Sequence, residues 1–182
     1  MTGKASRCES SRVEHSRQLV VMRHAKAEPH ADSDSERELS PRGYADAVEA
    51  GRWLADHGVA PDAALVSSAR RTTTTWLAVA EGGSFDAAAT YSDAFYLAGP
   101  EAALDLVRET PSAVVSLVVV GHNPTVAYLA QLLDDGTGDP RAGNRMAIGF
   151  PTAALARFEV TGTWRRLDLA SARLVGFHVG RG

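Results

Sequence analysis

The sequence predicts a single three-layer α/β domain, with a mainly parallel central sheet and helices on both faces. Three short apolar runs, residues 19–22, 63–66 and 116–120, are separated by stretches with helix start and stop signals. Each run is continuously apolar rather than alternating, which suits strands that are covered on both faces. With 182 residues, of which 45% are hydrophobic, the chain can bury one core of substantial size.

The first 17 residues differ in composition from the rest of the chain. Residues 1–17 are polar, rich in serine and mixed in charge, and they show neither alternation nor helical periodicity. We expect a flexible tail over 1–17 and one domain over 18–182. The chain has no apolar run of about 18 residues that could span a membrane and no apolar centre of a secretory signal. The expected location is therefore the cytoplasm.

Charge and cysteine content exclude several classes of function. The formal net charge of -3 gives no overall attraction to nucleic acid or to an anionic membrane, so neither is an expected partner. The single cysteine, Cys8, cannot form an intramolecular disulfide, and no Cys/His cluster has the spacing of a zinc site. Any affinity for phosphate must come from arginines that the fold brings together.

The first predicted strand ends in a pair of functional side chains. The run from Leu19 to Met22 is followed at once by Arg23 and His24. Ligands of open α/β sheets bind at the carboxyl ends of the strands, and this pair lies at such an end. An Arg-His pair after one strand is common by chance, so the interpretation depends on the later strands.

The loop that follows, residues 25–39, is acidic. It contains Arg37 among five carboxylates: Glu28, Asp32, Asp34, Glu36 and Glu38. The acids predict a solvated surface, because the glycine and the ordered ligand series of a calcium loop are absent. Ser40 and Pro41 then have the pattern of an N-cap and a first helical residue, which predicts a helix over 41–57.

The second strand, residues 63–66, also ends in polar residues. Ser67 and Ser68 are followed by Arg70, Arg71 and a run of threonines that opens a helix. Hydroxyls, arginines and the free N–H groups of a helix N-terminus together favour an anion site. The pattern alone leaves open whether Arg70 or Arg71 points inward.

The third and fourth strands complete the parallel part of the predicted sheet. A short strand over 88–91 and a helix over 101–109 precede the clearest strand, residues 116–120. That strand ends in Gly121, His122, Asn123 and Pro124, so a second histidine follows a strand end. A structural histidine, hydrogen-bonded beneath a loop, is the alternative interpretation of His122.

The last part of the chain predicts a hairpin. Residues 134–142 are rich in Gly, Asp and Pro and are interpreted as a linker loop. Apolar residues over 153–160 and 164–169, joined by Thr161, Gly162 and Thr163, predict two antiparallel strands.

Taken in order, the strand-end residues resemble the histidine phosphatase superfamily, which implies a phosphoglycerate mutase-like fold. Ala25 stands where the family's Arg-His-Gly signature has glycine. The small SixA-type phosphohistidine phosphatases are the more similar branch, through residues 33–43, 67–75, 96–101 and 121–124. The resemblance implies that His24 is the nucleophile. The other residues it implies at the phosphoryl group are Arg23, Arg37, Ser67, Arg71, His122 and Asn123.

Chemistry agrees with these implied roles. Arginine forks match the oxygens of a phosphoryl group, whose charge spreads over three of them in the transition state. Neighbouring arginines also favour the neutral, nucleophilic form of a histidine by lowering its pKa. We therefore expect neither a metal ion nor another cofactor.

The larger branches of the family add an acid that protonates the leaving oxygen, and no residue matches it well here. Asp93 is the nearest candidate. The preferred function is a phosphatase that acts on phosphohistidine in a protein through a phosphohistidine intermediate. The alternatives are a broad phosphomonoesterase that acts on small phosphate esters and a binding module that retained the pocket without turnover.

Overall fold

The computed structural model describes residues 16–182. The elements in chain order are β1 (Arg17–Arg23), η1 (Asp34–Glu36), α1 (Pro41–Asp56), β2 (Ala63–Ser67), α2 (Arg70–Gly83), β3 (Ala88–Ser92), α3 (Asp93–Leu97), α4 (Pro100–Arg108), β4 (Ser116–Gly121), α5 (Thr125–Leu133), α6 (Pro140–Ile148), β5 (Ala154–Val160), η2 (Trp164–Arg166) and β6 (Ala172–Val179). The expected tail over 1–17 lies outside the described residues except for Ser16 and Arg17, and Arg17 is the first residue of β1.

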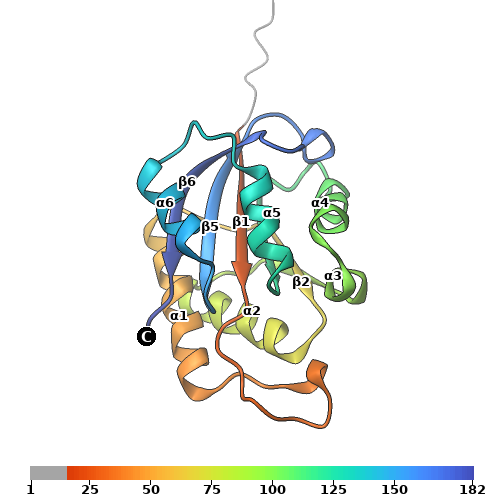
Figure 1. Cartoon of the computed structure of the whole chain (residues 1–182), viewed down its shortest axis with the longest axis vertical. Helices are drawn as coiled ribbons and strands as arrows, with labels where there is room; N and C mark the ends of the chain where they lie inside the picture. Colours follow the sequence, from red (N-terminus) through yellow and green to blue (C-terminus); the bar gives the residue numbers. More distant parts are fainter. Residues whose placement is uncertain (1–15) are drawn as a thin grey trace, which may run out of the picture.

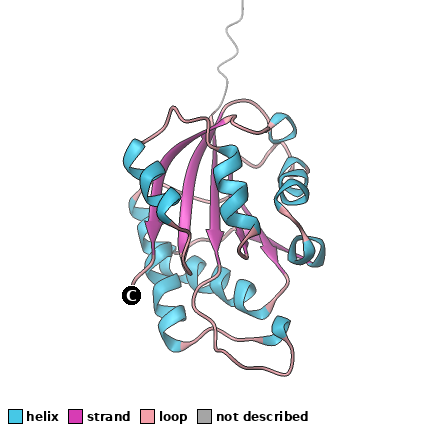
Figure 2. Cartoon of the chain, viewed as in Figure 1, coloured by secondary structure: helices cyan, strands magenta, loops and turns pink. Residues whose placement is uncertain are grey.

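One six-stranded sheet forms the centre of the molecule, with helices on both faces (Figures 1 and 2). The strand order is β3-β2-β4-β1-β5-β6. The first four strands in this order pair in parallel, and β5 and β6 are antiparallel to their neighbours. The three-layer α/β fold with a mainly parallel sheet is therefore confirmed.

Two hydrophobic cores lie on the two faces of the sheet. Residues of α1 and α2 pack with Val20 and Met22 on one face, and residues of α4, α5 and α6 pack with Leu19 and Val21 on the other. All four of these β1 side chains are fully buried. Successive side chains of a strand point to opposite faces, so a continuous apolar run is what this central position requires.

The start of α1 holds the acidic loop against the sheet. The Ser40 hydroxyl accepts a hydrogen bond from the Gly43 N–H at 3.1 Å, and Pro41 is the first helical residue, as its position predicts. A Cβ atom at Gly43 would lie 2.0 Å from the carbonyl oxygen of Lys26. Glycine is therefore required where the chain that follows His24 crosses the helix start.

The predicted hairpin is wrong in its second strand. The partner of β5 is β6, residues 172–179, and not residues 164–169. Residues 164–166 form the 3-10 helix η2, because Trp164 turns into the core and its indole N–H donates to the Val114 carbonyl at 2.7 Å. A buried aromatic anchored in this way outweighs the alternating pattern of its neighbours.

The predicted linker over 134–142 is also partly wrong, because its last residues begin α6. Asp139 caps this helix by accepting from the Arg141 N–H at 2.9 Å, and Pro140 follows at its first position. The same Asp and Pro that indicated a loop are the start signal of a helix.

Among the described residues, no helix is long and apolar enough to cross a membrane.

Candidate active site

His24 and His122 meet at the carboxyl edge of the sheet because β1 and β4 are paired. Arg23 pairs with Gly121 at the end of this parallel ladder, so the next residue of each strand is a histidine. The two ring centroids lie 5.3 Å apart, and the rings are tilted by 54°. A Cβ atom at Gly121 would come within 2.9 Å of the Phe95 ring, so glycine is required at the end of β4.

A backbone hydrogen bond fixes the tautomer of the His24 ring. Its Nδ1 lies 2.7 Å from the carbonyl oxygen of Ala25, which can only accept a hydrogen bond. Nδ1 therefore carries the proton, and the neutral ring has its lone pair on Nε2. The Ala25 N–H in turn donates to the Thr75 hydroxyl at 3.0 Å, and this bond holds the residue after the histidine in place.

His24 is held in its neutral form. Burial lowers the pKa of His24 to about 4, and the positive charges of Arg71, Arg23 and Arg37 act in the same direction, while the hydrogen bond to Ala25 opposes them. An imidazole that stays unprotonated at neutral pH can attack an electrophile.

His122 faces the same site with one nitrogen unpaired. Its Nε2 lies 2.7 Å from the hydroxyl of the buried Ser67, and its buried Nδ1 has no hydrogen-bond partner among the described residues. Burial, Arg71 and His24 lower its pKa to about 3, so the ring is neutral. If the Ser67 hydroxyl donates to Nε2, the proton of the neutral ring is on Nδ1.

Arg71, and not Arg70, points into the site. Arg71 is buried, and its guanidinium donates to the Asp34 backbone carbonyl and, at 2.8 Å, to the Asp34 carboxylate. Arg70 is exposed and pairs with Glu38 at 2.9 Å. The difference follows from helix geometry, because consecutive residues of a helix point about 100° apart. Here only Arg71 turns under the acidic loop.

Asp34 connects three residues of the site, and the sequence did not single it out. It accepts hydrogen bonds from Arg71, from Arg37 at 3.2 Å and from the Tyr96 hydroxyl at 3.0 Å. Burial favours the neutral acid, but these three hydrogen bonds outweigh it and lower the pKa of Asp34 to about 2. The Tyr96 ring also packs edge-on against His122, with centroids 5.4 Å apart. One ionised carboxylate therefore occupies donors of both arginines.

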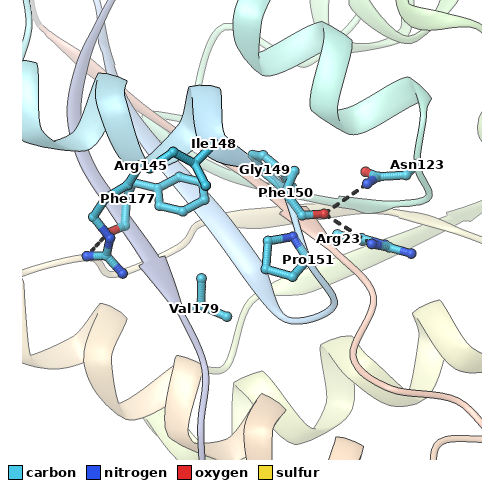
Figure 3. A pocket seen from close by; sticks show the side chains of 9 residues that line it. All are labelled: Arg23, Asn123, Arg145, Ile148, Gly149, Phe150, Pro151, Phe177 and Val179. Carbon is cyan, nitrogen blue, oxygen red and sulfur yellow. Dashed lines mark hydrogen bonds between the residues drawn. The ribbon is translucent and has the colours of Figure 1, made fainter.

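Arg23 and Asn123 share one backbone acceptor. Both donate to the carbonyl of Phe150, at 3.1 and 2.8 Å, as the dashed lines in Figure 3 show. Burial lowers the pKa of Arg23, and this side chain has no carboxylate partner among the described residues. The same two residues line a cavity of about 680 Å³ that extends toward β6.

Comparison with known proteins identifies the family. The model of the histidine phosphatase superfamily (branch 1) matches residues 19–91. The uncharacterized protein Rv1276c of Mycobacterium tuberculosis is 40% identical over 162 residues, which are 88% of this chain and 100% of that protein. The structure of a provisionally named phosphohistidine phosphatase SixA from Nakamurella multipartitia is 32% identical, with a TM-score of 0.80, over 91% of this chain and 96% of that one. This chain belongs to the histidine phosphatase superfamily.

A protein named as a phosphatase of a small phosphate ester has the same fold. The mycobacterial glucosyl-3-phosphoglycerate phosphatase Rv2419c is 18% identical, with a TM-score of 0.55, over 92% of this chain and 99% of that one. At this identity the likeness concerns the fold alone.

The residues that the superfamily resemblance implied fall into two groups. Six lie together at the carboxyl edge of the sheet: Arg23, His24, Ser67, Arg71, His122 and Asn123. Arg37 reaches the site from the loop, where it donates to the Glu28 carbonyl at 2.8 Å and to Asp34.

Asp93, the candidate acid, is not joined to this site. It is the exposed first residue of α3, and no hydrogen bond or ion pair links it to the histidines or arginines described above. Ser92 caps the helix by accepting from the Phe95 N–H at 3.0 Å. A carboxylate in the first turn of a helix is favoured by the helix dipole, which accounts for Asp93 without a chemical role.

Among residues 16–182, no group of three or more His, Cys, Asp or Glu side chains is arranged to hold a metal ion.

Proposed function

We propose that this protein is a phosphatase that acts through a phosphohistidine intermediate on His24 and that its substrate is phosphohistidine in a protein. The observation that carries the proposal is the state of His24. Its Nδ1 is bound to the Ala25 carbonyl, its pKa is lowered to about 4, and three arginines surround it. A neutral imidazole with Nε2 as its free nitrogen is an activated nucleophile for a phosphoryl group.

The proposed reaction has two steps, transfer of the phosphoryl group to His24 and its hydrolysis. In the first, the Nε2 lone pair forms a bond to phosphorus while the bond from phosphorus to the leaving nitrogen or oxygen breaks, and the leaving group takes a proton. In the second, a water oxygen forms a bond to phosphorus while the bond between phosphorus and Nε2 of His24 breaks. The protons of the water pass to the released phosphate and to solvent, and the neutral ring with its proton on Nδ1 is regenerated. Arg23, Arg37, Arg71 and His122 stabilise the equatorial oxygens in both steps.

The preference for phosphohistidine rests on the carboxylates of the site. Asp34 is the one carboxylate among the described residues that contacts the arginines Arg37 and Arg71, and a pKa of about 2 leaves it ionised at neutral pH. An ionised carboxylate cannot donate a proton to a leaving group. An alkoxide leaving group gains about 10²–10⁴-fold from a positioned acid, whereas an imidazole leaving group has a nitrogen that solvent can protonate.

The alternative function is hydrolysis of small phosphate esters, because the same nucleophile and arginines suit the phosphoryl group of an ester. It requires a proton donor, for which Asp93 is the candidate, brought to the site when substrate binds. A phosphate-binding module without turnover ranks third, because the nucleophile and the arginines are all present.

A series of leaving groups tests the proposal. We expect kcat/KM to be high for phosphohistidine and phosphoramidate, intermediate for aryl phosphates and low for alkyl phosphates. Asp93→Asn is expected to have little effect on phosphohistidine. If alkyl esters are the best substrates and Asp93→Asn selectively reduces their turnover, the enzyme is a small-molecule phosphatase.

A further inference from the structure

The mouth of the candidate active site is bordered on two sides by exposed apolar side chains. Ile148 at the end of α6 is 89% exposed and Leu97 at the end of α3 is 81% exposed, and these are the highest values among the exposed large hydrophobic residues of 16–182. Single exposed apolar residues are common on protein surfaces. Here both belong to segments at the carboxyl edge of the sheet, because α3 follows β3 directly and Ile148 precedes the start of β5, which pairs with the end of β1.

Both residues are connected to the site through their neighbours. Leu97 follows Tyr96, which contacts Asp34 and His122. Ile148 lies two residues before Phe150, whose carbonyl holds Arg23 and Asn123, and Figure 3 shows these residues around the cavity. The apolar residues are therefore part of the rim of the site.

The wall of the cavity next to Ile148 is apolar, and contacts with Arg145 hold it in place. Phe150, Phe177 and Val179 line it together with Ile148. Arg145 braces this wall, because its guanidinium donates to the Phe177 carbonyl at 3.0 Å and lies 5.6 Å from the centre of the Phe177 ring. The cavity can accept an apolar side chain beside the phosphoryl site.

The strands next to which Leu97 and Ile148 lie are far apart in the sheet. Leu97 belongs to the helix after β3, and Ile148 precedes β5. Four inter-strand spacings separate β3 from β5 in the sheet order, which at about 4.8 Å each is about 19 Å. A surface that contacts both residues while its phosphoryl group reaches His24 has the dimensions of a protein.

The acidic loop gives a third side of the mouth a negative charge, which favours a partner with a basic surface there. Four exposed carboxylates of the acidic loop surround a second hollow beside Arg37, namely Glu28, Asp32, Glu36 and Glu38. A partner that lies over this loop is complementary when its surface is basic there.

We propose that this rim is a docking surface for a folded phosphohistidine protein whose phosphorylated histidine is flanked by apolar side chains, with basic residues on the side that faces the acidic loop. The proposal rests on the proposed function and names the residues that would select a protein over free phosphohistidine.

The experiment compares two substrates for the full-length enzyme: the free amino acid phosphohistidine, and a small protein phosphorylated with phosphoramidate on one histidine that has apolar neighbours and a basic surface beside it. The measured quantity is the ratio of kcat/KM for the protein to kcat/KM for the amino acid. Ile148→Ser and Leu97→Ser are each expected to lower this ratio about tenfold, because each loses the burial of one aliphatic side chain against the partner. Exposed positions tolerate these changes without unfolding.

Leu169→Ser is the matched control. Leu169 is 51% exposed and precedes Ala172, which pairs with Val160 at the edge of the sheet opposite the active site. The ratio is expected to stay at the wild-type value in this variant. Wild-type ratios in both Ile148→Ser and Leu97→Ser overturn the docking proposal and leave the proposed function standing. If the wild-type enzyme hydrolyses neither phosphohistidine substrate, both proposals are wrong.

Discussion

Two parts of the site hold their side chains in different ways. We call Arg23, His24, Ser67 and His122 the strand-end group, and Asp34 with Arg37 the loop group. In the strand-end group, the ladder between β1 and β4 and the bonds to Ala25 and Phe150 fix the side chains. In the loop group, side chains alone hold the Asp34 carboxylate, which accepts from Arg37, Arg71 and the Tyr96 hydroxyl and is 56% exposed.

The difference indicates how the charges of the site are balanced. The strand-end group presents Arg23 without a carboxylate partner among the described residues, whereas Arg37 and Arg71 share one carboxylate, that of Asp34. Exposed ion pairs contribute about 0–1 kcal/mol to stability, so the contact of Asp34 with Arg37 costs little to exchange for a phosphoryl group. The strand-end group is preorganised, and we expect the loop group to rearrange when a phosphoryl group binds.

The largest effect is expected in the strand-end group, from His24→Ala. The variant lacks the nitrogen that accepts the phosphoryl group, so turnover of phosphohistidine should be abolished while the fold, followed by circular dichroism, is retained. Full activity in this variant would falsify the assignment of the nucleophile.

Arg71 lies where the two groups meet, and its neighbour Arg70 offers a matched control. Arg71→Ala should lower kcat/KM by about 10²–10³, the cost of losing one donor to the oxygens of the transition state. Arg70→Ala removes the same charge from an exposed pair with Glu38 and should change kcat/KM by less than about twofold. Equal losses in both variants would mean that general charge, rather than contact with the phosphoryl group, determines the rate.

The pH profile tests the environment of the strand-end group. In the proposed mechanism His24 reacts in its neutral form, and burial lowers its pKa to about 4. Activity should therefore be present above this value and be lost as the pH falls through about 4. A histidine with an ordinary pKa of about 6.5 would lose activity about 25-fold between pH 7 and pH 5. The measurement is kcat/KM against pH, corrected for ionisation of the substrate, and a fall centred near 6.5 contradicts the account.

The smallest effect is expected in the loop group, from Asp34→Asn. The variant removes a negative charge from the side of Arg71, so inorganic phosphate should inhibit about three- to tenfold more strongly. Asp32→Asn removes the same charge from an exposed position of the same loop and is the control. Unchanged or weaker inhibition by phosphate in Asp34→Asn would show that Asp34 does not compete with the ligand.

The same division accounts for what could be predicted from the sequence. The strand-end histidines follow continuous apolar runs, and strands of this kind must lie in the middle of the sheet with their ends at one edge. The residue at each end is therefore predictable. Arg71 could not be distinguished from Arg70 by this argument, because the choice depends on how α2 is rotated against the sheet.

The loop group could not be predicted from local pattern. Asp34 is one of five carboxylates in a polar loop, and nothing in the sequence distinguishes the one that folds back onto Arg71. Phe150 was missed for another reason, since it contributes a backbone carbonyl, which any residue type supplies. The sequence pattern predicts that residues 164–169 pair with β5, whereas β6 pairs with it. The pattern fails because Trp164 is buried, and this tertiary contact overrides the local alternation.

Rapid-quench trapping of the intermediate tests the central claim most directly. Wild-type enzyme mixed with a phosphohistidine substrate and quenched in alkali during turnover should carry one phosphoryl group, stable to alkali and labile to acid, and peptide mapping should place it on His24. The account is contradicted if turnover proceeds with no phosphoryl group on the enzyme or with the group on a residue other than His24.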